Sequence, residues 1–141
     1  MPSTQALTNQ AKKDFLSGVH APSDTYKLAL YTDSANLSKD TTTYTPTGEF
    51  VGGGYVAGGE VVPGNYTVTL LGDTAYIDFP DQDGPMWTGV TLTNITTALL
   101  YNYSKANAAI AVFTFAPVST ISGSFLAKLP DPGVTALIRF T

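Results

Sequence analysis

The chain has 141 residues, the size of one domain, of which 43% are hydrophobic and only 13% charged. A chain of this length buries a stable core without disulfides, and low charge with ample aromatic residues excludes a disordered protein. The net charge of -4 argues against nucleic acid or an anionic membrane as partner, because phosphate binding needs clustered lysine and arginine. The absence of cysteine excludes thiolate catalysis and thiolate metal sites.

The scarcity of charge has two interpretations. A surface in which threonine, serine, asparagine and glycine replace charged residues costs little to desolvate against a protein partner. An ordinary threonine-rich β domain has the same composition. The sequence contains no apolar run long enough to cross a bilayer, and its first ten residues are polar and do not resemble an export signal. We therefore expect a chain that folds in a cytoplasm, with no membrane as partner.

The N-terminal region predicts one helix over about residues 5–19. An apolar residue recurs every four positions, which is typical of a helix with one buried face. Thr4 or Ser3 is the expected N-cap, and Gly18 is expected to end the helix. This helix is expected either to pack on the sheet of its own domain or to dock on a neighbour. The predicted apolar stripe consists of Leu7, Ala11, Phe15, Leu16 and Val19.

A glycine- and threonine-rich segment, about residues 33–59, shows no clear strand pattern. Segments of this length without regular structure are uncommon in compact domains and are often functional. Its aromatic residues are either anchors on their own domain or contacts for a partner. Its glycines supply backbone with positive φ or allow a neighbouring chain to approach closely. The candidate interaction residues are Tyr44, Phe50, Gly52, Gly53, Gly54 and Tyr55.

The rest of the chain predicts short strands in sequential pairs. A strand with one buried face begins at Tyr26, and Gly72-Asp73 is a tight hairpin turn. With no second helix between the strands, the expected fold is mostly β, an antiparallel sandwich or barrel-like domain with one N-terminal helix. The whole chain, 1–141, forms one domain in this interpretation. The expected pairs are 66–71 with 74–79, 87–93 with 97–103, the latter with 109–115, and 125–129 with 135–140 around a turn at 130–133.

Catalytic side chains are scarce. The single histidine, His20, can be written into a Ser–His–Asp arrangement with Asp24, but no nucleophile-elbow pattern accompanies it. The only glutamates, Glu49 and Glu60, lie in or beside the glycine-rich segment, a poor placement for a glycosidase pair. We expect no enzyme, no catalytic residue and no cofactor.

Two further patterns leave alternatives open. Asp78, Asp81 and Asp83 resemble part of a calcium loop, but no closing glutamate follows, so a solvated turn without metal is the favoured interpretation. Trp87, Tyr101 and Tyr103 either belong to the core or form a platform for carbohydrate.

The segment 98–116, ALLYNYSKANAAIAVFTFA, resembles a hairpin of small structural proteins of tailed bacteriophages, the head decoration and minor tail proteins. Further similarity lies in TYKLALYT at 25–32, AYIDF at 75–79 and TALIR at 135–139. The resemblance spans nearly the whole chain, but its motifs are strands and turns and include no active site. Thr96-Thr97 and Thr114 depart from the usual pattern, which leaves the subgroup open.

The resemblance implies a virion protein on the capsid surface or in the tail, assembled in the cytoplasm of a bacterial host. The first expectation is a capsid decoration (cement) protein that stabilises the head by multivalent contacts. The implied partners are the major capsid protein or other virion proteins, and further copies of the chain in a homo-oligomer, a dimer or trimer. A tail or baseplate component is the alternative within the particle. A receptor- or carbohydrate-binding module is the alternative of another class.

Overall fold

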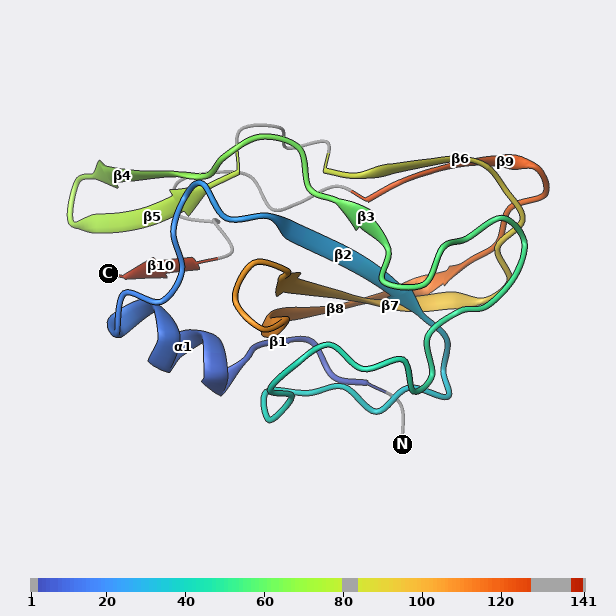
Figure 1. Ribbon diagram of the computed structural model, residues 1–141, viewed down its shortest axis with the longest axis horizontal. Coiled ribbons are helices and arrows are strands. Elements are labelled where there is room, and N and C mark those ends of the chain that lie inside the picture. The colour runs from blue at the N-terminus through green and yellow to red at the C-terminus, as the bar shows by residue number, and fades with distance from the viewer. Residues whose placement is uncertain (1–2, 80–83, 128–137, 141) are drawn as a thin grey trace.

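The computed structural model describes residues 3–79, 84–127 and 138–140. Its strands pair in antiparallel fashion, and one helix lies near the N-terminus (Figure 1), which confirms the predicted fold class. The elements are β1 (Ala6–Leu7), α1 (Asn9–Leu16), β2 (Tyr26–Tyr31), β3 (Glu60–Val61), β4 (Thr67–Leu71), β5 (Thr74–Asp78), β6 (Met86–Val90), β7 (Ile95–Asn102), β8 (Ala108–Val118), β9 (Gly123–Leu126) and β10 (Ile138–Phe140).

A five-stranded sheet with the order β1-β8-β7-β2-β3 forms the centre of the molecule. β2 pairs with β7 without interruption from Tyr26 opposite Asn102 to Tyr31 opposite Thr97. β7 continues into β8 through the turn expected from the sequence, in which Ala106 and Asn107 have positive φ. This hairpin contains most of the residues that carry the phage resemblance.

Both faces of this central sheet are buried, although the sequence predicts a single buried face for β2. Leu28 and Leu30 face the main core, whereas Ala29 and Tyr31 belong to a second core on the opposite face. The alternation in the sequence is real, but the residues between the large apolar ones, Ala29 and Tyr31, are also compatible with burial. Only the tertiary structure shows that the 33–59 segment supplies their cover, with Leu37 and Tyr44 among its contributions.

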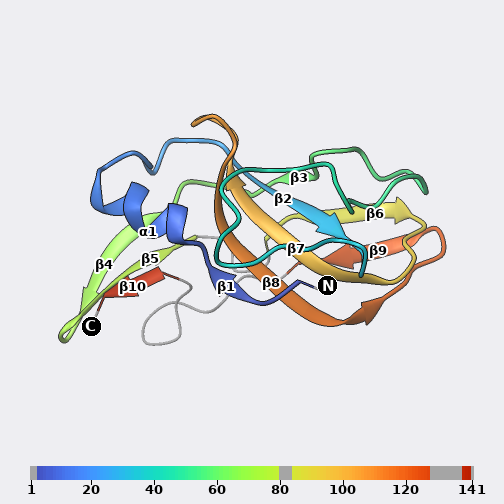
Figure 2. The same cartoon turned by 90° about the horizontal axis from the view of Figure 1, so that it is seen from below.

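The second layer consists of a three-stranded sheet, β10-β5-β4, and a two-stranded ribbon, β6-β9. The two units lie at opposite ends of the central sheet (Figures 1 and 2). They bury Tyr66, Phe79, Trp87 and Val90 against its main-core face. The hairpin of β4 and β5 is confirmed with the predicted turn at Gly72-Asp73.

Two predicted strand pairings are wrong. β6 pairs with β9 instead of β7, and β10 pairs with β5 instead of β9. The short connection from β6 to β7 crosses between the two layers, with Asn94 at positive φ. Period-two alternation indicates a half-buried strand but carries no information on its neighbour, so sequential pairing fails at this crossing. The predicted turn at 130–133 lies outside the described residues.

The helix is shorter than predicted. Residues 6 and 7 pair with the edge of β8, so α1 begins only at Asn9. Its N-cap is Thr8, whose hydroxyl accepts from the Ala11 amide and donates to the Ala109 carbonyl. Ala11 faces the core, but Leu16 is exposed. α1 packs against β8, in agreement with the first of the two predicted roles.

Candidate interaction surface

The 33–59 segment is a structured cover over one face of the central sheet. Its backbone hydrogen-bonds to the sheet from Tyr44 to Asn107, from Ala109 to Thr42 and from Phe50 to Leu30. Because its backbone is bonded along its length, the segment presents its outer residues in a fixed arrangement.

Glu49 holds this cover in place. Its side chain is buried and accepts hydrogen bonds from the Tyr44 hydroxyl at 2.7 Å, the Tyr55 hydroxyl at 2.7 Å and the Gly58 amide at 2.8 Å. The Tyr55 hydroxyl also accepts from the Leu30 amide at 2.9 Å, which joins the cluster to β2. Burial, together with the hydrogen bond to the Glu49 carboxylate, raises the pKa of Tyr55 far above its ordinary value. These contacts make Glu49 a structural link between the 33–59 segment and β2.

The aromatic candidates are anchors on their own domain. Tyr55 is buried, Phe50 is half-buried with its ring against Tyr55, and Tyr44 stacks on Tyr101 with 5.0 Å between ring centroids. The Tyr101 hydroxyl donates to the Gly58 carbonyl at 2.6 Å, and burial raises the pKa of Tyr101 to about 12. Of the two alternatives left open by the sequence, the structure places these aromatics inward.

The three candidate glycines are exposed and all have positive φ. Gly53 also lies against Thr91: a Cβ there would stand 1.9 Å from the Thr91 carbonyl oxygen. The Thr91 amide in turn donates to the Gly53 carbonyl at 2.8 Å. The close approach permitted by Gly53 is therefore to another loop of the same chain. Gly52 has open space around it.

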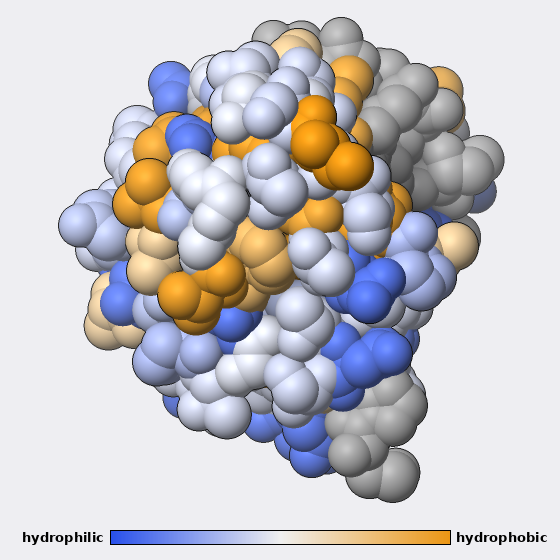
Figure 3. Space-filling model, turned by 90° about the vertical axis from the view of Figure 1, so that its right-hand side faces the viewer, coloured by the Kyte–Doolittle hydropathy of each residue, from blue (hydrophilic) through white to orange (hydrophobic). Residues whose placement is uncertain are grey.

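Three exposed apolar side chains lie at the end of the molecule where the 33–59 segment meets the loops that follow β6 and β8. They are Val51, Val56 and Ile121, which are 87%, 67% and 88% exposed. We call these three residues the end patch. The loops that carry them meet at Thr91, which binds Gly53 through its backbone and the Ser122 amide through its hydroxyl. Figure 3 shows apolar side chains gathered on this end among polar ones. The end patch was not predicted from the sequence, although Val51 and Val56 lie on either side of the candidate glycines. The prediction selected the larger aromatic residues of this segment instead.

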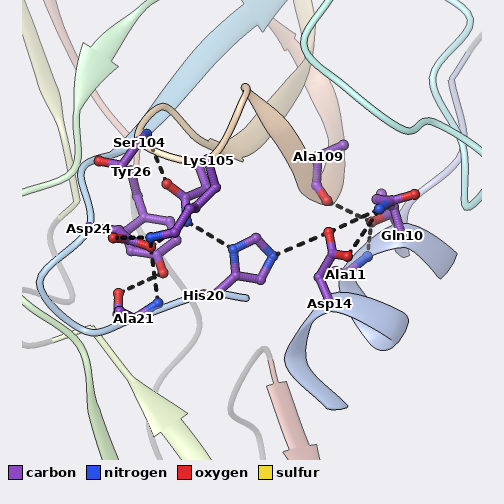
Figure 4. A network of polar contacts seen from close by, with 12 residues as sticks. Gln10, Ala11, Asp14, His20, Ala21, Asp24, Tyr26, Ser104, Lys105 and Ala109 are labelled. Carbon is purple, nitrogen blue, oxygen red and sulfur yellow. Dashed lines mark hydrogen bonds and ion pairs between the residues drawn. The ribbon is translucent and has the colours of Figure 1, made fainter. Parts of the chain in front are cut away.

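A second polar cluster surrounds His20 (Figure 4). The Asn102 amide nitrogen donates to His20 Nδ1 at 2.9 Å and to Asp24 at 2.8 Å. The neutral ring therefore has its proton on Nε2, which lies 3.8 Å from the Asp14 carboxylate. Lys105 from the β7–β8 turn completes the cluster by its ion pair with Asp24 at 2.9 Å.

The cluster joins α1, the segment before β2 and the β7–β8 turn. Burial lowers the pKa of His20, against the opposing effect of Asp14 and Asp24. Burial disfavours the charged form of Asp24, but hydrogen bonds from Lys105, Asn102 and the Ala21 amide outweigh it and lower the pKa to about 2. Asp24 bonds to Asn102 and not to the imidazole, so the Ser–His–Asp arrangement considered from the sequence is not formed. The contacts are those of a structural cluster.

The aromatic candidates for a carbohydrate platform do not come together on the surface. Trp87 and Tyr101 are buried and only Tyr103 is exposed, so the three aromatics do not form the platform considered for carbohydrate. Asp78 ends β5, while Asp81 and Asp83 lie outside the described residues. Within the part of the chain that the structure describes, no group of histidine, cysteine, aspartate and glutamate is arranged to hold a metal ion. No helix of the described residues is long and apolar enough to span a membrane.

No family model matches this chain, and no curated protein or solved structure is significantly similar to it. The role of this chain is therefore inferred from its residues, its fold and its surface.

Proposed function

We propose that this chain is a structural protein of a tailed-phage particle, and specifically a capsid decoration protein that stabilises the head through protein–protein contacts. The observation that carries the binding role is the end patch: three strongly exposed apolar side chains at one end of the domain. The assignment to a virion is supported by the sequence resemblance alone. On this proposal the partner of the end patch is the major capsid protein or another virion protein.

The build of the surrounding loops supports binding. Val51 and Val56 project from a segment that is fixed through Glu49, and Ile121 projects from a loop tied to Thr91. A patch on a fixed backbone loses little conformational entropy on association, so more of its apolar contact contributes to affinity.

The proposed mechanism is additive. One end patch contributes a modest apolar contact, which is weak by itself. Many copies on a shell, or several patches in one homo-oligomer, raise the effective concentration at each neighbouring site and convert weak contacts into durable attachment. Binding to the assembled shell then stabilises the shell by mass action.

Copy number tests the location. Quantitative mass spectrometry of purified particles from the phage that encodes this chain is expected to give a copy number comparable to that of the major capsid protein. A copy number comparable to that of tail-tip components would replace the head assignment by the tail alternative. Absence from the particles would overturn the virion proposal.

The end patch is tested by a triple variant in which Val51, Val56 and Ile121 are each replaced by aspartate. All three side chains are exposed, so the variant is expected to fold, while charge on the patch abolishes co-sedimentation with the particles. Leu16→Asp is the matched control, since Leu16 is 77% exposed on α1 and lies away from the patch. Circular dichroism checks the fold of both variants. Unchanged co-sedimentation of the triple variant would show that another surface binds the particle.

A further inference from the structure

Among the described residues, β4 is an open edge of the three-stranded sheet. In the order β10-β5-β4 its outer side has no strand partner among the described residues, and all five of its residues are exposed. Its sequence, TVTLL, contains no charge and no proline, the two usual devices that block edge pairing. By contrast, the edge strands of the central sheet, β1 and β3, have only two residues each. β4 is therefore suited to receive another strand.

The hairpin fixes which backbone groups of β4 are free. Gly72, at φ +60, begins the two-residue turn, so Leu71 and Thr74 form its hydrogen-bonded closing pair. Hydrogen-bonded and non-hydrogen-bonded pairs alternate along an antiparallel ladder. The N–H and C=O groups of Val68 and Leu70 therefore point away from β5, toward the open edge.

We propose that β4 pairs with β4 of a second copy of this chain, antiparallel, about a twofold axis at Thr69. In this register Val68 lies opposite Leu70 of the second copy, and each of these pairs exchanges two backbone hydrogen bonds. Thr69 lies opposite its own equivalent, and Thr67 lies opposite Leu71. The two three-stranded sheets become one continuous sheet of six strands.

The side chains of β4 suit this self-pairing. Val68 and Leu70, 65% and 71% exposed, lie on the face of the sheet shared by Ile77 and Ile138. Pairing places each exposed valine beside an exposed leucine and joins the apolar faces of both copies. Cross-strand pairs of this kind stabilise sheets, whereas like charges opposite each other destabilise them.

Charge favours a second copy as the occupant. Because the chain is acidic, self-association requires that its carboxylates avoid one another. β4 itself carries no ionisable side chain, so the paired strands bring no carboxylates together. The proposed interface therefore contains no pair of like charges. Each copy makes the same contacts with the other, as a twofold dimer requires.

Single-cysteine variants test the register directly. The chain has no cysteine, so a disulfide in such a variant joins two chains. Thr69→Cys places two thiols in a non-hydrogen-bonded pair on the axis, where Cα atoms about 4.5 Å apart fall within the range for a disulfide. Thr67→Cys is the matched control, because its equivalents lie four residues apart along the paired strands. Oxidation followed by non-reducing electrophoresis is expected to cross-link Thr69→Cys at least about tenfold faster; equal rates would overturn the register.

Charge substitution tests the pairing without a cross-link. In Val68→Lys/Leu70→Lys every apolar pair of the interface becomes a lysine pair, and the dimer dissociation constant in analytical ultracentrifugation is expected to rise about tenfold or more. The dissociation constant of Val68→Glu/Leu70→Glu is expected to rise in the same way. A mixture of the lysine and glutamate variants is expected to form dimers again through Lys–Glu pairs. Val61→Lys/Met86→Lys, at two residues that are 50% and 52% exposed on β3 and β6, is the control and is expected to leave the dimer intact. A monomeric wild type, an unaffected lysine variant or a mixture without dimers would overturn the proposal.

This inference does not rest on the proposed function. Both experiments use the purified full-length chain, so a failure of the end patch to bind particles leaves their outcomes unchanged. If β4 instead accepts a strand of another virion protein, the wild type is monomeric alone and the Thr69 variant does not cross-link, which overturns the self-pairing.

Discussion

At the scale of single residues, Glu49 and His20 show how buried polar groups hold this domain together. Each joins segments far apart in the sequence: Glu49 links two parts of the 33–59 segment to β2. His20 links the segment before β2 to the β7–β8 hairpin through Asn102, and its ring lies against that of Phe15 on α1. Buried polar groups are costly unless they are hydrogen-bonded, so removal of one partner costs more than the bond itself contributes.

Glu49→Gln is expected to lower the free energy of unfolding by about 1–3 kcal/mol. The amide has one acceptor oxygen where the carboxylate receives three donors, so at least one donor among Tyr44, Tyr55 and Gly58 loses its partner. Urea denaturation followed by fluorescence measures the change. Glu60→Gln is the control, because Glu60 is exposed on β3 and is expected to cost little. Equal midpoints for both variants would contradict the structural role of Glu49.

His20 is expected to make the protein less stable in mild acid. Burial lowers its pKa in the folded state, so the unfolded chain binds the proton more readily. The stabilising effect of the neutral ring is complete above about pH 6.5 and declines as the pH falls toward the folded-state pKa. The free energy of unfolding, measured in urea from about pH 7.5 to 5.5, is expected to fall with pH in the wild type. In His20→Gln the slope over this range is expected to be smaller; an identical slope would assign the effect to another group.

At the scale of elements, the cover formed by the 33–59 segment depends on glycines where it touches β2. A Cβ on Gly59, which has φ +80, would lie 1.8 Å from the Leu28 carbonyl oxygen. Gly52 also has positive φ but stands in open space. Backbone strain therefore affects both positions, whereas steric conflict affects Gly59 alone.

Gly59→Ala is accordingly expected to destabilise the fold more than Gly52→Ala. The substitution at Gly52 costs about 1–2 kcal/mol from left-handed backbone, and that at Gly59 costs about 1–3 kcal/mol more from overpacking. Thermal unfolding by circular dichroism gives the order of the two. Equal melting temperatures would show that the cover moves away from β2 without cost.

At the scale of the whole molecule, stability is expected to be uneven. β7 is buried along its full length and pairs on both sides, whereas β4 is exposed along its full length and lies at an edge. Regions with many buried contacts open only with global unfolding, while exposed edges open locally at lower free energy.

Hydrogen exchange of backbone amides tests this distribution. The amides of Leu99 and Leu100 are expected to exchange most slowly, and those of Val68 and Leu70 rapidly at low protein concentration. If β4 pairs with a second copy, protection of Val68 and Leu70 rises with concentration while that of β7 stays constant. Slow exchange of the Val68 and Leu70 amides at every concentration would contradict the open edge.

The sequence by itself determined the fold class, the strand at 26–31, the hairpins at Gly72-Asp73 and at 104–108, and the absence of thiol chemistry. These features depend on local periodicity, turn chemistry and composition, which neighbouring residues encode. Only the tertiary structure decided that β6 pairs with β9, that Tyr44 and Tyr55 face inward, and that Val51 and Ile121 share one end. Those outcomes depend on which surfaces meet across the two layers. A period-two pattern predicts that one face of a strand is buried, but it does not identify the residues that cover that face.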